Sequence, residues 1–231
     1  MGPHPLWLLE DLLQDVDLQA GMRVLDLGCG LGMTSTFLAH EFDVDVVAAD
    51  YWIDANENQE RFDADGVSPR VTAVDAEAHA LPFDYGEFDA IISVDSFHYF
   101  GTSDLYIGYI SKFLKPGGAL AVASPGAVVE PRALGGLPHH VRRLAGWEAL
   151  SFHTAEWWRF HWEQSQQVVI SSTRSQPEGW ADWLLWCQVC AQHSGDAAVR
   201  EGSQSCVAPL VEDGGAFITF MLQVARAVAR P

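Results

Sequence analysis

The run RVLDLGCGLG, residues 23–32, constrains the fold more than any other part of the chain. Its first half is apolar apart from Arg23 and Asp26, as in a central parallel strand that is buried on both faces. Glycines at positions 28, 30 and 32 let the backbone approach a ligand closely, because no Cβ stands in the way. A helix is predicted over 33–40, and its first amide groups would face the same ligand.

A dinucleotide-binding turn of the form G-x-G-x-x-G is the competing interpretation of this run. Counted from Gly28, the third glycine position holds Met33, so that fingerprint is incomplete. Asp26 places a carboxylate ahead of the turn, which suits a ligand with an amino group better than a pyrophosphate. The run therefore favours a small-molecule cofactor other than a dinucleotide.

Two further carboxylates stand where predicted strands end. Asp50 follows the second strand, and a carboxylate at that point accepts hydrogen bonds from ribose hydroxyls in nucleotide-binding α/β folds. A helix N-cap is the alternative role for Asp50. Tyr51 comes directly after it and could pack on the sugar or base, while Asp75-Ala76 follows the third strand and offers an acceptor for an exocyclic amine.

Strands and helices alternate along the first half of the chain, a pattern typical of a parallel sheet with crossover connections. After a first helix over 5–20, strands are predicted at 22–27, 44–49, 70–74, 88–94 and 119–123, with helices at 54–65 and 103–114. Beyond residue 124 the alternation lapses. The remainder is predicted as an irregular segment at 125–150, helices at 154–164 and 177–193, and strands at 167–172 and 216–224.

The glycine turn and the two strand-end carboxylates, with Leu81-Pro82-Phe83, residues 88–93 and the Lys115-Pro116-Gly117-Gly118 turn, resemble the motifs of class I S-adenosylmethionine (SAM) dependent methyltransferases. The resemblance covers roughly residues 20–124. It implies a Rossmann-like α/β fold: a seven-stranded, mostly parallel sheet flanked by helices. It also implies SAM as the cofactor, S-adenosylhomocysteine as the product, and cofactor contacts at Asp26, Gly28, Cys29, Gly30, Asp50, Tyr51, Asp75, Ala76 and Ser93. Val94 departs from the pattern, since many relatives carry a small polar residue there.

A single domain over residues 1–231 is expected, with the core at about 20–124, an insertion-rich acceptor region at about 125–212 and the final strand at about 216–224. The insertions after strands five and six would cover the ligand edge of the sheet as lids. A large hydrophobic core is the alternative role for their aromatic residues.

His98 is the candidate general base, because it lies just past the fourth strand, where the methyl group should point. Tyr99 and Asp95 would support it, and a structural or merely pocket-lining role for His98 is the alternative. Candidate acceptor contacts are His98, His153, Trp157, Trp158 and His161. The last four could equally be core residues, and metal binding is the least favoured interpretation.

The composition argues against two classes of binding partner. The formal net charge of −18, with 13 Lys and Arg residues, argues against nucleic acid and against an anionic membrane surface. Neither a signal peptide nor a run of 18 apolar residues is apparent, so a cytoplasmic protein is expected. The four cysteines do not resemble a disulfide framework, and packing is favoured over metal or redox chemistry for Cys187-Gln188-Val189-Cys190.

The sequence as a whole predicts SAM-dependent methyl transfer to a small-molecule acceptor, with no metal. A non-catalytic regulator that binds SAM or S-adenosylhomocysteine is one alternative. Other SAM chemistry on the same fold is another. The acceptor, the atom that is methylated and the oligomeric state stay open.

Overall fold

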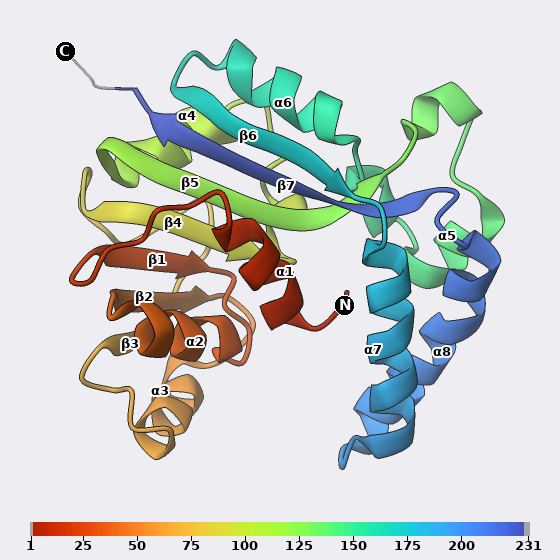
Figure 1. The fold of residues 1–231 in the computed structure, drawn as a ribbon, viewed down its shortest axis with the longest axis horizontal. Coiled ribbons are helices and arrows are strands. Elements are labelled where there is room, and N and C mark those ends of the chain that lie inside the picture. The colour runs from red at the N-terminus through yellow and green to blue at the C-terminus, as the bar shows by residue number, and fades with distance from the viewer. Residues whose placement is uncertain (1, 229–231) are drawn as a thin grey trace.

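A computed structural model describes residues 2–228 of the chain, which build a sheet in the order β3-β2-β1-β4-β5-β7-β6 (Figure 1). The ladders from β3 to β5 are parallel, whereas β7 runs antiparallel to both β5 and β6. The predicted seven-stranded, mostly parallel sheet is therefore confirmed. Its strands are β1 (Arg23–Leu27), β2 (Asp45–Asp50), β3 (Val71–Asp75), β4 (Phe88–Val94), β5 (Leu114–Ala127), β6 (Val168–Gln176) and β7 (Ile218–Ala227).

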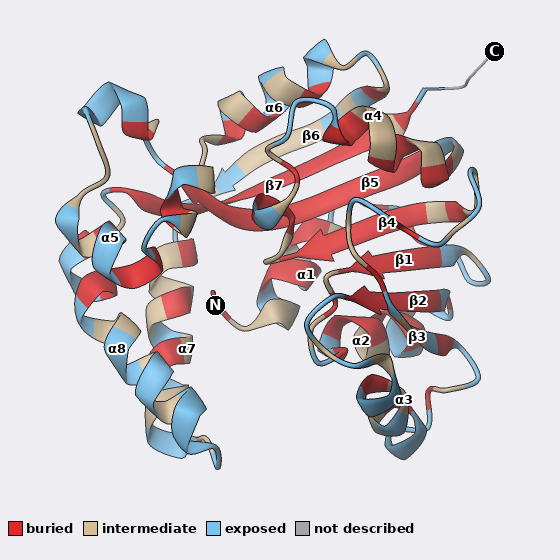
Figure 2. Ribbon diagram, turned by 180° about the vertical axis from the view of Figure 1, so that it is seen from behind, coloured by how far each residue is buried: buried red, intermediate tan, exposed pale blue. Residues whose placement is uncertain are grey.

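Helices cover both faces of the sheet, and the buried strands run between them (Figure 2). One hydrophobic cluster joins α1, α2, α3 and α7 to one face, and a second joins α4 and α6 to the other. The helices are α1 (Pro5–Leu13), α2 (Met33–Phe42), α3 (Ala55–Ala64), α4 (Tyr106–Ile110), α5 (His139–Ala145), α6 (Ala155–Gln164), α7 (Gly179–His193) and α8 (Ala197–Asp213). Short 3-10 turns are η1 (Phe97–Tyr99), η2 (Ser111–Phe113), η3 (Pro131–Leu134) and η4 (Glu148–Ser151).

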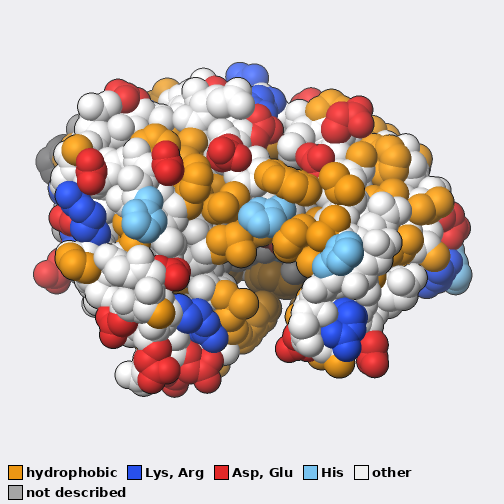
Figure 3. Space-filling view, turned by 60° about the horizontal axis from the view of Figure 1, so that its bottom comes forward, with side chains coloured by type: hydrophobic (Ala, Val, Ile, Leu, Met, Phe, Trp, Pro, Cys, Tyr) orange, Lys and Arg blue, Asp and Glu red, His pale blue; other side chains and the backbone are white. Residues whose placement is uncertain are grey.

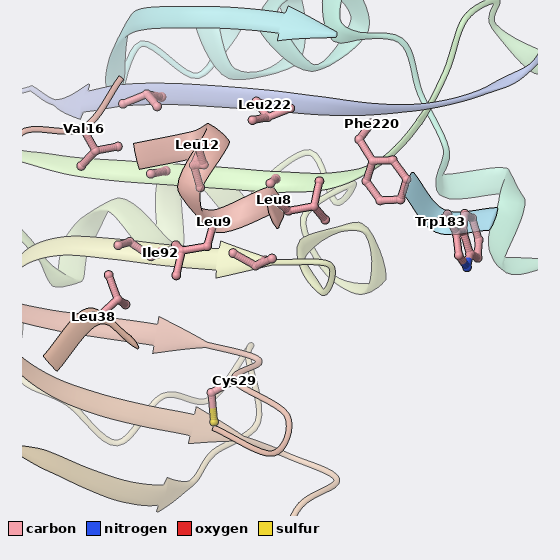
Figure 4. Close-up of a cluster of buried hydrophobic side chains, with 14 of the residues drawn as sticks. Leu8, Leu9, Leu12, Val16, Cys29, Leu38, Ile92, Trp183, Phe220 and Leu222 are labelled. Atoms are coloured by element: carbon pink, nitrogen blue, oxygen red, sulfur yellow. The ribbon is translucent and has the colours of Figure 1, made fainter. Parts of the chain in front are cut away.

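The first helix is anchored by leucines at helical spacing. Leu8, Leu9 and Leu12 are fully buried, and they project from α1 toward β4 and β7 (Figure 4). The helix ends at Leu13 rather than at residue 20 as predicted, and the following chain buries Val16 against the same cluster. This packing fixes the segment that precedes α1 against the sheet.

The larger departures from the sequence predictions lie after β4. The helix expected at 103–114 is the short α4 followed by η2, and β5 extends beyond the predicted 119–123 at both ends. The segment 125–150 contains α5, and the insertion after β6 contains a second long helix, α8, which packs on α7 (Figure 1). The expected role of these insertions as lids stays a prediction.

Three further features of the described residues concern membrane spans, metal ligands and cysteines. No helix within residues 2–228 is long and apolar enough to cross a membrane. The described part of the chain contains no group of three or more His, Cys, Asp or Glu residues placed to hold a metal ion. All four cysteines are free, and Cys187 is buried.

Candidate active site

A cavity of about 710 Å³ opens at the carboxyl ends of β1, β2 and β4, within the range of roughly 300–1,000 Å³ that is usual for small-molecule sites. Figure 3 shows the molecule hollowed between two lobes, with hydrophobic side chains gathered around the hollow. The lining comes from the glycine turn, residues 49–52, residues 76–79, residues 94–96 with 99 and 100, the N-terminal residues 2, 3 and 5, and Trp186 of α7.

The glycine turn forms one wall, and its glycines serve different purposes. The N–H groups of Gly28 and Cys29 both donate to the carbonyl oxygen of Ala49, at 2.8 and 3.2 Å, which fixes the turn against β2. A Cβ on Gly28 would collide with the side chain of Ser96, so that glycine is required by packing within the protein. A Cβ on Gly30, where φ is +56°, would meet no protein atom within 4 Å. Gly30 therefore gives a ligand access to the backbone.

Two serines hold the end of β1 in place. The hydroxyl oxygens of Ser93 and Ser96 lie 2.9 and 3.0 Å from the carbonyl oxygen of Leu27 and 2.7 Å from each other. Ser93 is fully buried and does not line the cavity, whereas Ser96 does. A direct contact between Ser93 and the cofactor stays a prediction. In the structure, the hydrogen bonds of Ser93 support the glycine turn.

Asp26 lies beneath the turn. Its Oδ2 accepts hydrogen bonds of 2.6 Å from the hydroxyls of Thr34 and Ser35 at the start of α2, and the side chain is absent from the cavity lining. Burial raises the pKa of Asp26 to about 6, although the two hydroxyl bonds oppose that shift. The carboxyl thus joins β1 to α2 below the glycines, and its expected contact with the cofactor stays a prediction.

Asp50 does line the cavity, and its carboxylate is held in a fixed orientation. Oδ2 accepts a 2.8 Å bond from the N–H of Gly30, and Oδ1 accepts bonds of 2.8 and 3.1 Å from the N–H groups of Trp52 and Ile53. The carbonyl oxygen of Gly30 accepts a further bond from Asn58 Nδ2. Because several backbone donors position it, this carboxylate is ready to accept hydroxyl groups from a ligand without further rearrangement.

The remaining predicted cofactor residues divide between the cavity and its surroundings. Tyr51 and Ala76 line the cavity, and 71% of the Tyr51 surface is exposed. Cys29 also lines it, and burial raises the pKa of its thiol far above the usual range. Asp75 lies outside the lining, where its Oδ1 accepts a 2.7 Å bond from the N–H of Ala55 at the start of α3.

The residues that follow β4 face different environments. Tyr99 lines the cavity and donates a 3.3 Å hydrogen bond from its hydroxyl to Glu148 Oε2, and burial raises its pKa above the ordinary value. His98 points away from the lining and is buried against Phe152, with ring centroids 5.8 Å apart. Burial lowers the pKa of His98 to about 3. The structure therefore places Tyr99, but not His98, where it can touch a ligand in this cavity.

The four aromatic and histidine residues expected to contact the acceptor lie together, but outside this cavity. The His153, Trp157 and His161 rings are stacked, with successive centroid distances of 3.7 and 4.6 Å, and Glu130 Oε2 lies 3.0 Å from His153 Nδ1. Trp158 is fully buried in the cluster between α6 and the sheet. Their contact with an acceptor stays a prediction.

Comparisons with known proteins identify the framework. Residues 24–118 match the family described as methyltransferase domain. Over 119 residues the chain is 31% identical to the methyltransferase GfsG of Streptomyces halstedii, across 50% of this chain and 42% of that protein. Residues 24–118 are a class I SAM-dependent methyltransferase domain.

Two further methyltransferases match more of the chain. This chain is 28% identical to the sarcosine/dimethylglycine N-methyltransferase of Aphanothece halophytica over 173 residues, which are 67% of this chain and 59% of that protein. The structure of phosphoethanolamine N-methyltransferase 2 from Haemonchus contortus, with phosphomonomethylethanolamine and S-adenosylhomocysteine, matches with a TM-score of 0.81 at 17% identity. That match covers 99% of this chain and 54% of the other. The chain thus spans less than two thirds of each of these methyltransferases.

Two observations show that the residues lining this cavity fit SAM, the cofactor of the methyltransferase family. The space above Gly30 is open to a ligand, and the Asp50 carboxylate is held beside it by the Gly30 N–H. Ala76 and Tyr51 complete the same side of the cavity. These residues would hold the methionine and nucleoside parts of SAM.

The opposite wall of the methyltransferase cavity was not predicted from the sequence. It is made by Gly2 and Pro3 ahead of α1, by Pro5 at the start of α1 and by Trp186 of α7. The tryptophans of α7 at helical spacing did signal an apolar helix face, but Trp183 of the same helix is a core residue. Periodicity alone does not separate a side chain that fills the core from one that lines a cavity on the adjacent face.

Proposed function

We propose that this chain is a SAM-dependent methyltransferase that acts on a small molecule. The observation that carries the proposal is the shared cavity, whose lining includes Gly30 and Asp50 together with Tyr99 and Trp186. A cofactor held by Gly30 and Asp50 would share this cavity with the acceptor. The sarcosine and phosphoethanolamine methyltransferases to which the chain is similar support a small-molecule acceptor.

Bound SAM supplies an electrophilic methyl group on a sulfonium. Asp50 accepts ribose hydroxyls, and the open backbone at Gly30 admits the amino-acid part. The aromatic side chains across the cavity orient the acceptor and exclude water from it, and orientation is the main contribution that an enzyme makes to a direct group transfer.

Where the acceptor must lose a proton, we propose Asp95 as the group that accepts it. Asp95 is the residue after β4 and lines the cavity, and its carboxyl lies beside Gly2, which lines the same cavity. Burial raises the pKa of Asp95 to about 7, in the range that suits a general base at neutral pH. The His98 hypothesis stays open, but it would need the imidazole to move into the cavity.

Calorimetry with SAM and with S-adenosylhomocysteine tests cofactor binding directly. Micromolar dissociation constants are expected for both, equivalent to about −8 kcal/mol. Asp50→Asn should weaken both by roughly 10-fold or more, because hydrogen bonds to a charged acceptor contribute about 1.5–3 kcal/mol. Gly30→Val should weaken them further by occupying the open space. Tyr85→Ala is the control, since Tyr85 lies outside the cavity and packs on Phe113. Normal affinity in Asp50→Asn and Gly30→Val would contradict the placement of the cofactor.

Turnover separates the proposal from its alternatives. Incubation with SAM and a panel of small acceptors should yield S-adenosylhomocysteine together with a methylated product, as detected by mass spectrometry. Tight binding of SAM without any turnover would favour a regulatory binder. A product that has not gained a methyl group would indicate other chemistry on the same fold.

A further inference from the structure

The part of the cavity that faces the glycine turn has a distinctive composition. We call it the acceptor arm and define it by Pro3, Pro5, Tyr99, Phe100 and Trp186. Three of these five side chains are aromatic, while Pro3 precedes α1 and Pro5 is its first residue. Such a surface buries a planar or apolar molecule favourably.

The aromatic walls are held in place by their neighbours. The Trp186 ring packs edge-on against His4 at 4.6 Å and against Trp7 at 6.2 Å between centroids. Across the cavity, Trp52 packs edge-on against Tyr99 at 5.2 Å, with 71% of Trp52 and 36% of Tyr99 still exposed. Large aromatic surfaces that stay uncovered around a cavity mark a place where a ligand is to be bound.

The charged side chains that line the cavity are mainly acidic. Within residues 2–228 the lining includes the carboxyl groups of Asp50, Glu77 and Asp95 but no Lys or Arg. His79 also lines the cavity, yet its Nδ1 lies 2.8 Å from Glu77 Oε1, so even a protonated imidazole would be balanced by that carboxylate.

Several basic side chains are paired with carboxylates outside the cavity. Arg23 pairs with Glu87 at 2.7 Å, Lys115 with Asp89 at 2.7 Å, and Arg174 with Asp11 at 3.0 Å. A phosphate or carboxylate in the acceptor arm would therefore lose its hydration without a Lys or Arg in the described lining, in a cavity that also holds three carboxyl groups. Burying an anion in that way is strongly unfavourable.

We infer that the acceptor arm takes an aromatic or other apolar acceptor that carries no phosphate or carboxylate group. This inference rests on the proposed function. It separates the chain from two proteins to which it is similar: the names of those relatives specify sarcosine, which has a carboxylate, and phosphoethanolamine, which has a phosphate. In this chain, recognition comes from ring stacking and apolar contact, and the carboxylates exclude anions.

Matched pairs of probes test the inference on the full chain saturated with S-adenosylhomocysteine. 4-Hydroxybenzamide and 4-hydroxybenzoate differ in charge at nearly constant shape, and tyramine differs from tyrosine by the loss of the carboxylate. Sarcosine and phosphoethanolamine complete the set. Binding is followed by NMR through the indole N–H signal of Trp186, which Trp186→Phe assigns. We expect 4-hydroxybenzamide and tyramine to shift that signal with at least tenfold higher affinity than their carboxylate partners.

Controls separate failure of this inference from failure of the proposed function. If calorimetry shows no binding of S-adenosylhomocysteine, the proposed function itself fails. If the cofactor binds but 4-hydroxybenzoate, sarcosine or phosphoethanolamine binds as tightly as 4-hydroxybenzamide and tyramine, the inference is overturned. The absence of any Trp186 shift with 4-hydroxybenzamide and tyramine also overturns it. With probe binding measured by calorimetry, Trp186→Ala should weaken it several-fold, whereas Tyr85→Ala should leave it unchanged.

Discussion

At the scale of single residues, Asp95 and His98 show how position after a strand decides chemistry. Both follow β4 within four residues, and both are shifted in pKa by burial. Asp95 lines the cavity, with its carboxyl beside Gly2, whereas His98 lies outside the lining and packs against Phe152. A pKa near 3 keeps the His98 imidazole neutral across the physiological range, so the titration that matters near pH 7 belongs to Asp95.

Asp95→Asn tests that assignment. A base must be deprotonated to act, so kcat/KM for an acceptor that loses a proton should fall as pH drops below about 7. The variant should lose that inflection and lower kcat by roughly 10²–10⁴-fold. Carbon-13 NMR of the Asp carboxyls should show one signal titrating near pH 7 that is missing in Asp95→Asn.

His98→Gln is the matched comparison, because it removes the imidazole from a buried position. We expect a loss of stability with less than a tenfold change in kcat. If instead His98→Gln lowers kcat a hundredfold while Asp95→Asn retains the pH profile, the base is His98 and the loop after β4 must rearrange when ligands bind.

The residues that could be predicted best from the sequence are those whose positions are fixed by the register of the strands. Asp50 at the end of β2 and Gly30 in the turn are brought together by the parallel register of β1 and β2, which the motif spacing indicates. The same logic placed Asp26 and Asp75 at strand ends. It could not foresee that Thr34, Ser35 and the Ala55 N–H would engage them, since those partners depend on how α2 and α3 dock.

At the scale of elements, α7 divides its tryptophans between two tasks. Trp183 is fully buried and packs against Phe220 of β7, with ring centroids 6.0 Å apart (Figure 4). Trp186, one turn later, lines the acceptor arm. The core contact of Trp183 thus fixes the helix that presents Trp186 to the cavity.

Trp183→Ala should therefore destabilise the chain by about 3–5 kcal/mol, as other large-to-small changes of buried aromatic residues do. Trp186→Ala should cost much less stability, because its ring is part of a cavity wall rather than of the closed core. Urea unfolding followed by circular dichroism measures both. Equal losses in the two variants would mean that Trp186 is a core residue and would remove it from the acceptor arm.

The elements themselves were predicted with unequal success. The first four strands lie within about a residue of their predicted bounds, because continuous apolar runs between turn residues are a strong signal. Helix α8 was missed because it contains Gly202, two serines and an internal Pro209, which give it a weak helical pattern. Packing against α7 and α5 stabilises it instead, and such tertiary support cannot be read from local sequence.

At the scale of the whole molecule, the net charge of −18 acts in the same direction as the carboxylates that line the cavity. An acidic protein of this kind attracts cations toward its surface and repels anions, most strongly at low ionic strength. SAM carries the positive charge of its sulfonium, whereas S-adenosylhomocysteine has lost that charge with the methyl group. The molecule therefore has an electrostatic means of preferring substrate over product.

Salt should distinguish the two ligands. The Debye length falls from about 30 Å at 0.01 M to about 8 Å at 0.15 M ionic strength, so the field of the distant carboxylates is largely screened over that range. The dissociation constant of SAM should rise several-fold between these conditions, while that of S-adenosylhomocysteine should change little. Calorimetry at both ionic strengths, in the same buffer at pH 7.5, provides the measurement. Sinefungin, whose extra amine is protonated in place of the sulfonium, should follow SAM. Parallel salt dependence for SAM and S-adenosylhomocysteine would show that the acidic surface does not reach the cofactor, and the preference for SAM would then have to come from direct contacts in the cavity.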